Sequence, residues 1–206
     1  MNAEIEADFF NPSIRQLPLE YVQDWYSAAY DPEKGVAKAT WAYLLPRLLE
    51  ILAFGEDVAN VGIEVSLSRF DTGNPENWSK EEWAVLDRFQ KMLLQNRIED
   101  TTDFLDDVIC MFRLAGWPLD DLTAQVETGS SEKLALRLWN DWCSGVVPGR
   151  ESIWVTAFWN SPDQSRILAF YTSDGLYEKM ASLALDDDTE PELAAKASTV
   201  ASIMRP

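Results

Sequence analysis

Residues 31–55, DPEKGVAKATWAYLLPRLLEILAFG, decide the fold that we expect for this chain. At 100° per residue, the large apolar side chains of this stretch share one broad arc of a helix, and small or charged residues fall opposite. The residues on the arc are Trp41, Leu44, Leu45, Leu48, Ile51 and Leu52. The stretch therefore predicts a helix that is buried between neighbouring helices.

The ends of this helix carry their own signals. Asp31 can accept hydrogen bonds from free amides as an N-cap, and Pro32 suits the first helical position because its φ is already fixed. Gly55 can close the helix in a left-handed conformation. Pro46 lies inside the helix and removes the hydrogen bond to the Ala42 carbonyl. We therefore expect a bent helix that wraps against its partners.

Helix signals recur along the chain and predict an all-α fold. Ser79 with Glu82, and Thr189 with Glu192, form capping boxes before two further helices. We expect about nine or ten helices of roughly 10–20 residues, stacked in antiparallel pairs. At this length the chain is interpreted as a single domain, residues 1–206. Within it, residues 1–16 form an irregular N-terminal arm.

Two segments allow more than one interpretation. Residues 56–70 carry apolar side chains that could alternate as a strand or continue as a helix, and we favour a helix because both neighbours are helical. Residues 152–172 are rich in aromatic and β-branched side chains, so a small β-hairpin is one alternative. Against the hairpin, Ser161, Pro162 and Gln164 are typical of a helix start, and two helices are the favoured interpretation.

The charge balance bears on the class of partner. The chain has 35 acidic and 17 basic residues, a net charge of −18. Because nucleic-acid binding rests on Lys and Arg that neutralise phosphates, this balance argues against DNA or RNA, and anionic membranes should repel the chain. The excess of acidic residues indicates either a charged surface that keeps the protein in solution or a surface that binds a basic protein partner. The N-terminal sequence MNAEIEADFF lacks the basic-then-apolar order of a signal peptide, so we expect a cytoplasmic protein.

The phrase WAYLLPRLLE, residues 41–50, contains an L-P-R-x-L-E pattern. It is similar to a signature of uncharacterised bacterial all-helical proteins. Helix pairs whose first member has an internal proline and a leucine-rich face also resemble HEAT and armadillo repeats, and pairs recur here at roughly 35–45 residues. The resemblance covers residues 20–145 and implies an α–α superhelical fold, but it brings no catalytic residues with it.

Several kinds of catalytic or cofactor site are excluded by composition. The chain has no histidine, which removes His-based triads and His-containing metal or haem sites. No P-loop, GxGxxG or GxSxG motif is present. Catalysis would have to rest on carboxylates, but neighbours such as Asp106 and Asp107 point about 100° apart on a helix and are interpreted as solvated charges. We expect no cofactor, no catalytic residue and no metal ligand.

Two groups of residues are candidate binding sites. Arg47 and Glu50 flank the buried arc of the first helix, where they either form a pair that joins two helices or contact a partner. Trp139 and Trp142 share one helix face beside Asp141. Indoles at this spacing are more often core than surface, but exposed ones would form a protein-binding hot spot.

These features predict a helical protein without enzymatic activity that binds another protein, as a scaffold or regulatory module. A narrower hypothesis is an immunity-type inhibitor, whose acidic surface would block a basic toxin. The competing class is a carboxylate-dependent enzyme that uses a divalent metal. The sequence itself identifies neither the partner nor a substrate.

Overall fold

In the computed structural model, which describes residues 13–27, 35–99, 103–144 and 151–205, the regular elements are helices. The α-helices are α2 (Leu19–Ser27), α3 (Lys38–Ala53), α4 (Lys80–Glu99), α5 (Leu105–Leu114), α6 (Leu119–Thr128), α7 (Ser131–Trp142), α8 (Ser161–Tyr171), α9 (Asp174–Leu185) and α10 (Pro191–Met204). The short 3-10 helices are η1 (Ile14–Gln16), η2 (Ile63–Val65) and η3 (Pro75–Asn77). The predicted all-α class is confirmed.

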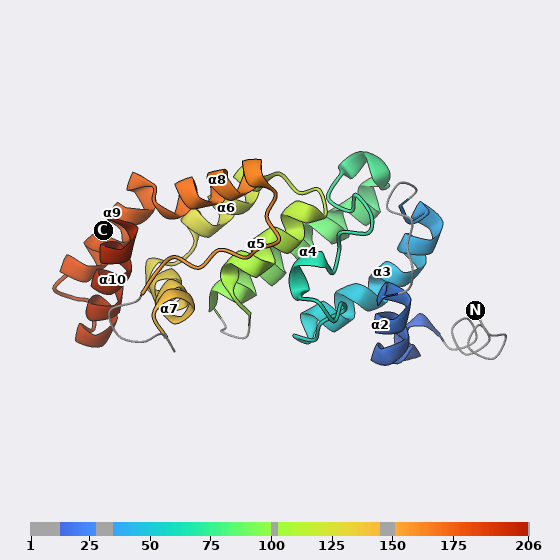
Figure 1. The fold of residues 1–206 in the computed structure, drawn as a ribbon, viewed down its shortest axis with the longest axis horizontal. Helices are drawn as coiled ribbons and strands as arrows, with labels where there is room; N and C mark the ends of the chain where they lie inside the picture. The colour runs from blue at the N-terminus through green and yellow to red at the C-terminus, as the bar shows by residue number, and fades with distance from the viewer. Residues whose placement is uncertain (1–12, 28–34, 100–102, 145–150, 206) are drawn as a thin grey trace.

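The helices follow one another along an elongated molecule, with α2 and α3 at one end and α9 and α10 at the other (Figure 1). In the middle, α4 packs against α5, α6 and α7, and α5 also packs against η2. At the far end, α10 packs against both α9 and α7. A superhelical stacking of these helices in the HEAT or armadillo manner stays a prediction.

Helix α3 buries the arc that the sequence predicts for it. Its buried residues are Trp41, Leu44, Leu45, Leu48, Ile51 and Leu52. Pro46 lies inside the helix, and Gly55 follows it with a φ of +76°, a left-handed conformation that suits glycine. The predicted start is wrong, because α3 begins at Lys38 after an extended Ala37 that has no capping side chain. Asp31 and Pro32 lie outside the described residues.

The helix predicted for residues 56–70 is wrong. This segment is a series of turns around the single 3-10 turn of η2, although Val58, Ile63 and Leu67 are buried in the core. Gly62 has a φ of +136°, which no residue within a right-handed helix adopts. The apolar residues of this segment therefore reach the core from turns.

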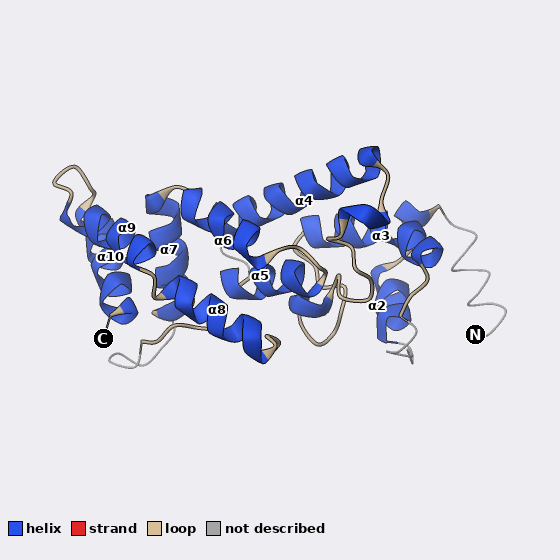
Figure 2. Ribbon diagram, turned by 90° about the horizontal axis from the view of Figure 1, so that it is seen from above, coloured by secondary structure: helices blue, strands red, loops and turns tan. Residues whose placement is uncertain are grey.

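The hairpin alternative for residues 152–172 is also wrong, since no strand occurs among the described residues (Figure 2). The second half is helix α8, as expected, but its N-cap is Asn160 instead of Ser161. The first half is not the expected helix. Residues 151–160, which we call the strap, run as irregular chain across α5 (Figure 1).

The predicted helix starts differ in accuracy. The capping box before α4 is confirmed: the Ser79 N–H donates to Glu82 Oε2 at 2.8 Å, and the Glu82 N–H donates to Ser79 Oγ at 3.2 Å. At α10 the prediction is wrong by one residue, since Glu190 accepts the bond from the Leu193 N–H. Of the predicted N-terminal arm, only residues 13–16 are described, and they contain η1.

Candidate functional site

Arg47 and Glu50 lie one turn apart on α3, and their contacts are within the protein. The Arg47 Nε–H donates to the Leu17 carbonyl at 3.1 Å, and its second nitrogen pairs with Glu50 at 3.3 Å. Glu50 also meets Arg15, whose side chain is 82% exposed, so that pair contributes little. In this geometry Arg47 joins α3 to the chain before α2. A role for Arg47 and Glu50 in binding a partner stays a prediction.

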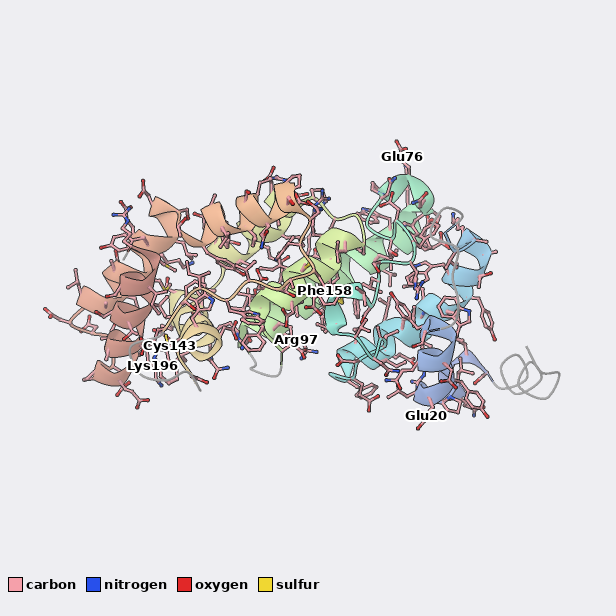
Figure 3. The ribbon with its side chains drawn as sticks, viewed as in Figure 1. Glu20, Glu76, Arg97, Cys143, Phe158 and Lys196 are labelled. Carbon is pink, nitrogen blue, oxygen red and sulfur yellow. The ribbon has the colours of Figure 1, made fainter. Side chains whose placement is uncertain are left out.

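Trp139 and Trp142 differ in their surroundings. Trp142 is buried, and its ring meets Tyr171 of α8 edge to face at 5.3 Å between centroids. Trp139 is half-buried, and the ammonium of Lys196 from α10 lies 4.7 Å from its ring centroid. Figure 3 shows Lys196 at this end of the molecule, next to α7. Trp142 therefore belongs to the core, and only Trp139 presents part of its indole at the surface.

Asp141 is a structural residue in this geometry. It forms an ion pair with Arg137, one turn earlier on α7, and both side chains are almost fully buried. Its carboxylate also accepts the N–H of Leu105 at 3.1 Å. Burial raises the pKa of Asp141, although the hydrogen bond and charge of Arg137 act in the opposite direction. Solvent does not reach this pair, so a partner could contact it only after a rearrangement.

An apolar groove lies between α3 and α4, and we call it the α3–α4 groove. Its volume is about 490 Å³, and Trp78 lines it together with residues of both helices. The lining residues from α3 are Ala42, Leu45, Pro46, Leu49, Glu50 and Ala53, and those from α4 are Glu82, Val85, Leu86 and Phe89. Val85 is 54% exposed. Within the described part of the chain, the charged residues lining this groove are both acidic, Glu50 and Glu82.

A larger and more polar groove lies between α4 and α6, with a volume of about 1030 Å³. Trp83 and Trp117 stack in its wall, with ring centroids 6.0 Å apart. Its polar side chains bond to each other: Gln90 donates to Gln125 at 3.0 Å, and Gln125 donates to the Lys91 carbonyl at 2.7 Å. These bonds tie α4 to α6 and leave fewer polar groups for a ligand.

Sequence reasoning missed a group of buried carboxyl groups. Glu64 of η2 and Asp106 of α5 are 6% and 2% exposed, and Asp107 is half-buried and close enough to both to be affected by their charges. We call these three residues the carboxyl cluster. The prediction that Asp106 is a solvated charge is therefore wrong. The sequence carried a signal, because Cys110, a residue type that is usually buried, lies one turn after Asp106 on the same helix face.

The cluster changes the acidity of its members. Burial raises the pKa of Asp106 to about 6, although hydrogen bonds from the Thr156 N–H and the Trp159 indole lower it. Burial, helped by the negative charge of Glu64, raises the pKa of Asp107 to about 7. Burial also raises the pKa of the Cys110 thiol well above its ordinary range. Asp106 and Asp107 therefore retain their protons to a higher pH than exposed aspartates do.

No group of three or more Asp, Glu or Cys side chains in the described ranges is arranged to hold a metal ion. The hypothesis of a divalent-metal enzyme thus has no ligand set in the part of the chain that the structure shows. None of the described helices has the length and apolar character needed to cross a membrane. Comparisons with protein-family models, with curated proteins and with solved structures find no match.

Proposed function

We propose that this protein binds a basic, amphipathic segment of another protein in the α3–α4 groove. The observation that carries the proposal is the composition of that groove, in which the described lining residues are mostly apolar and the charged ones, Glu50 and Glu82, are acidic. An amphipathic helix buries its apolar face in such a groove, and this is a recurring mode of protein recognition. Its basic residues would then meet an acidic surface.

The apolar lining supports a docking role. Val85 is 54% exposed on α4, and Pro46 is exposed on α3. Exposed apolar patches of some size are uncommon on proteins without partners, since water contact with them costs free energy. A partner that covers Val85 and Pro46 would remove this cost. The helical stacking that we propose, similar to HEAT and armadillo repeats, would produce grooves of this kind between successive helices.

Charge supports a basic partner. The net charge of −18 attracts cationic proteins over a distance and speeds their association. Near the groove, Glu82 is exposed, whereas Glu50 pairs with Arg47 and with the exposed Arg15. A cytoplasmic location belongs to the same proposal, and it is compatible with Cys110 and Cys143, which are both free thiols.

In its narrower form, the proposal makes the protein an immunity-type inhibitor of a basic toxin. The high acidic charge supports this form, because electrostatic attraction gives fast binding to a cationic enzyme. A gene for a basic toxin next to the gene for this chain, together with inhibition that Val85→Glu abolishes, would support it. If Val85→Glu left the inhibition intact, the toxin would have to bind outside the α3–α4 groove.

The test uses a fluorescent peptide of about 18 residues made of leucine and lysine, with leucines at positions i, i+3, i+4 and i+7. A peptide of the same composition in scrambled order is its control. Fluorescence anisotropy measures the affinity of both peptides for the protein. We expect the amphipathic peptide to bind at least about tenfold more tightly than the scrambled one.

Substitution of valine by glutamate separates the groove from general electrostatic attraction. Val85→Glu should lower the affinity for the amphipathic peptide about tenfold, because a charge in the apolar groove opposes burial of the leucines. Val61→Glu is the matched control, since Val61 is 69% exposed and lies outside the groove. Both variants add one negative charge. Equal binding by both variants, or tighter binding by Val85→Glu, would refute the proposed groove.

A further inference from the structure

The strap is held to the body of the protein by hydrogen bonds that end on the carboxyl cluster. The Thr156 N–H donates to Asp106 Oδ2 at 2.7 Å, and the Trp159 indole donates to the same oxygen at 2.9 Å. The Thr156 hydroxyl bonds to Glu64. Two residues of the strap, Thr156 and Trp159, thus bond to two members of the cluster, Glu64 and Asp106.

No cation among the described residues pairs with the carboxyl cluster. Among the ion pairs of the described residues, none involves Glu64, Asp106 or Asp107. The arginines on the surrounding helices form ion pairs with other acids: Arg137 with Asp141, Arg113 with Asp163, and Arg97 with Asp103. Buried carboxylates are ordinarily paired with a cation or a metal, because burial of an isolated charge costs several kcal/mol.

The other ionisable groups around the cluster add negative charge or none. Asp141 of α7 and Asp163 of α8 are paired with arginines. Asp57 is affected by the negative charge of Glu64 and by the positive charge of Arg97, and Arg97 itself pairs with Asp103. Tyr171 of α8 and Cys110 of α5 stay neutral because burial raises the pKa of both. If all three carboxyl groups of the cluster were ionised, no ion pair among the described residues would neutralise any of their charges. Retained protons are the remaining way to limit its charge.

We propose that the strap responds to pH near neutrality, being closed while Asp106 or Asp107 retains a proton and opening when both are ionised beside Glu64. Full ionisation makes η2 and α5 repel each other at the point where the strap bridges them. Opening exposes the face of α5 that carries Asp106, and Cys110 lies one turn further on that face. Phe158 of the strap lies near the middle of the molecule (Figure 3), so opening of the strap would alter the middle of the protein and not one of its ends.

Hydrogen exchange at the Thr156 amide measures closure directly, because that N–H donates to a buried Asp106 oxygen. Exchange is followed by NMR at about pH 5.5 and about pH 8.5, and each rate is divided by the intrinsic rate of an unprotected amide at the same pH. We expect the protection of Thr156 to fall at least about tenfold over this range. Protection that is equal at both pH values would overturn the proposal.

Thiol labelling gives a second readout. In the Cys143→Ser background, Cys110 is the one remaining cysteine of the chain, and it is 0% exposed. Its labelling rate, relative to that of the urea-unfolded protein at the same pH, should rise about tenfold as the pH increases. A relative rate that does not change with pH would show that the α5 face stays covered.

Three variants connect both readouts to the cluster. Asp107→Asn and Glu64→Gln each remove one negative charge, so in both the strap should stay closed at about pH 8.5. Asp187→Asn removes the same charge from an exposed position and should behave as the wild-type protein does. Opening of all three variants with the pH dependence of the wild-type protein would assign the response to another group and refute the proposal.

Discussion

Arg137 and Asp141, one turn apart on α7, form an ion pair in which the two side chains are only 2% and 3% exposed. The Asp141 carboxylate also accepts the backbone N–H of Leu105, the first residue of α5. The pair thus joins α7 to the start of α5 inside the protein. The contribution of this ion pair to the stability of the protein can be measured without any knowledge of a binding partner.

Replacement of Asp141 by alanine should lower the free energy of unfolding by about 3–5 kcal/mol, because the buried Arg137 charge loses the carboxylate beside it. The double variant Arg137→Met/Asp141→Leu should lose less, since it removes both charges and fills the space with apolar groups. Urea unfolding followed by tryptophan fluorescence gives both values. A double variant less stable than Asp141→Ala would contradict this explanation.

Arg47→Met separates a structural role of Arg47 from a binding role. The loss of the bonds to Leu17 and Glu50 should lower the free energy of unfolding by about 1–2 kcal/mol. Binding of the leucine–lysine peptide should change by less than about twofold. Urea unfolding and fluorescence anisotropy test the two statements. A large loss of affinity in a stable variant would instead make Arg47 a binding residue.

Asp107→Asn should stabilise the protein at alkaline pH. The pKa of Asp107 is about 7 in the folded protein and lies at its ordinary value of 3.8 in the unfolded chain, so the folded state binds more protons between these values. The contribution of Asp107 to the free energy of unfolding is therefore fully present below about pH 4 and is lost as the pH rises through 7. At about pH 8.5 the variant should gain about 1–2 kcal/mol, allowing for solvent screening at a half-buried site.

The measurement is urea unfolding of both proteins at about pH 5.5 and about pH 8.5. The stability difference between Asp107→Asn and the wild-type protein should be smaller at the lower pH, where Asp107 is already neutral in the folded state. Asp187→Asn again serves as the control, because Asp187 is exposed. A difference of the same size at both pH values would mean that Asp107 does not titrate as described.

Local patterns predicted much of the fold. The arc of α3, the capping box of α4 and the glycine after α3 all depend on residues within a few positions of each other, and all are confirmed. Errors of one residue occurred at Asn160 and Glu190, where two neighbouring polar side chains could each cap the same helix. The candidate site residues were harder to interpret. Trp142 and Asp141 face the core. Their spacing along α7 did not decide between a buried and an exposed position.

The sequence by itself determined the helical class and the buried face of α3, because helix periodicity and capping act between residues that are close along the chain. Only the tertiary structure decided the course of the strap and the burial of Asp106. Thr156 bonds to Asp106 and Glu64, which are 50 and 92 positions away along the chain. A segment whose polar groups bond to such distant partners needs neither helix nor strand to satisfy them, so its conformation cannot be inferred from its own residues.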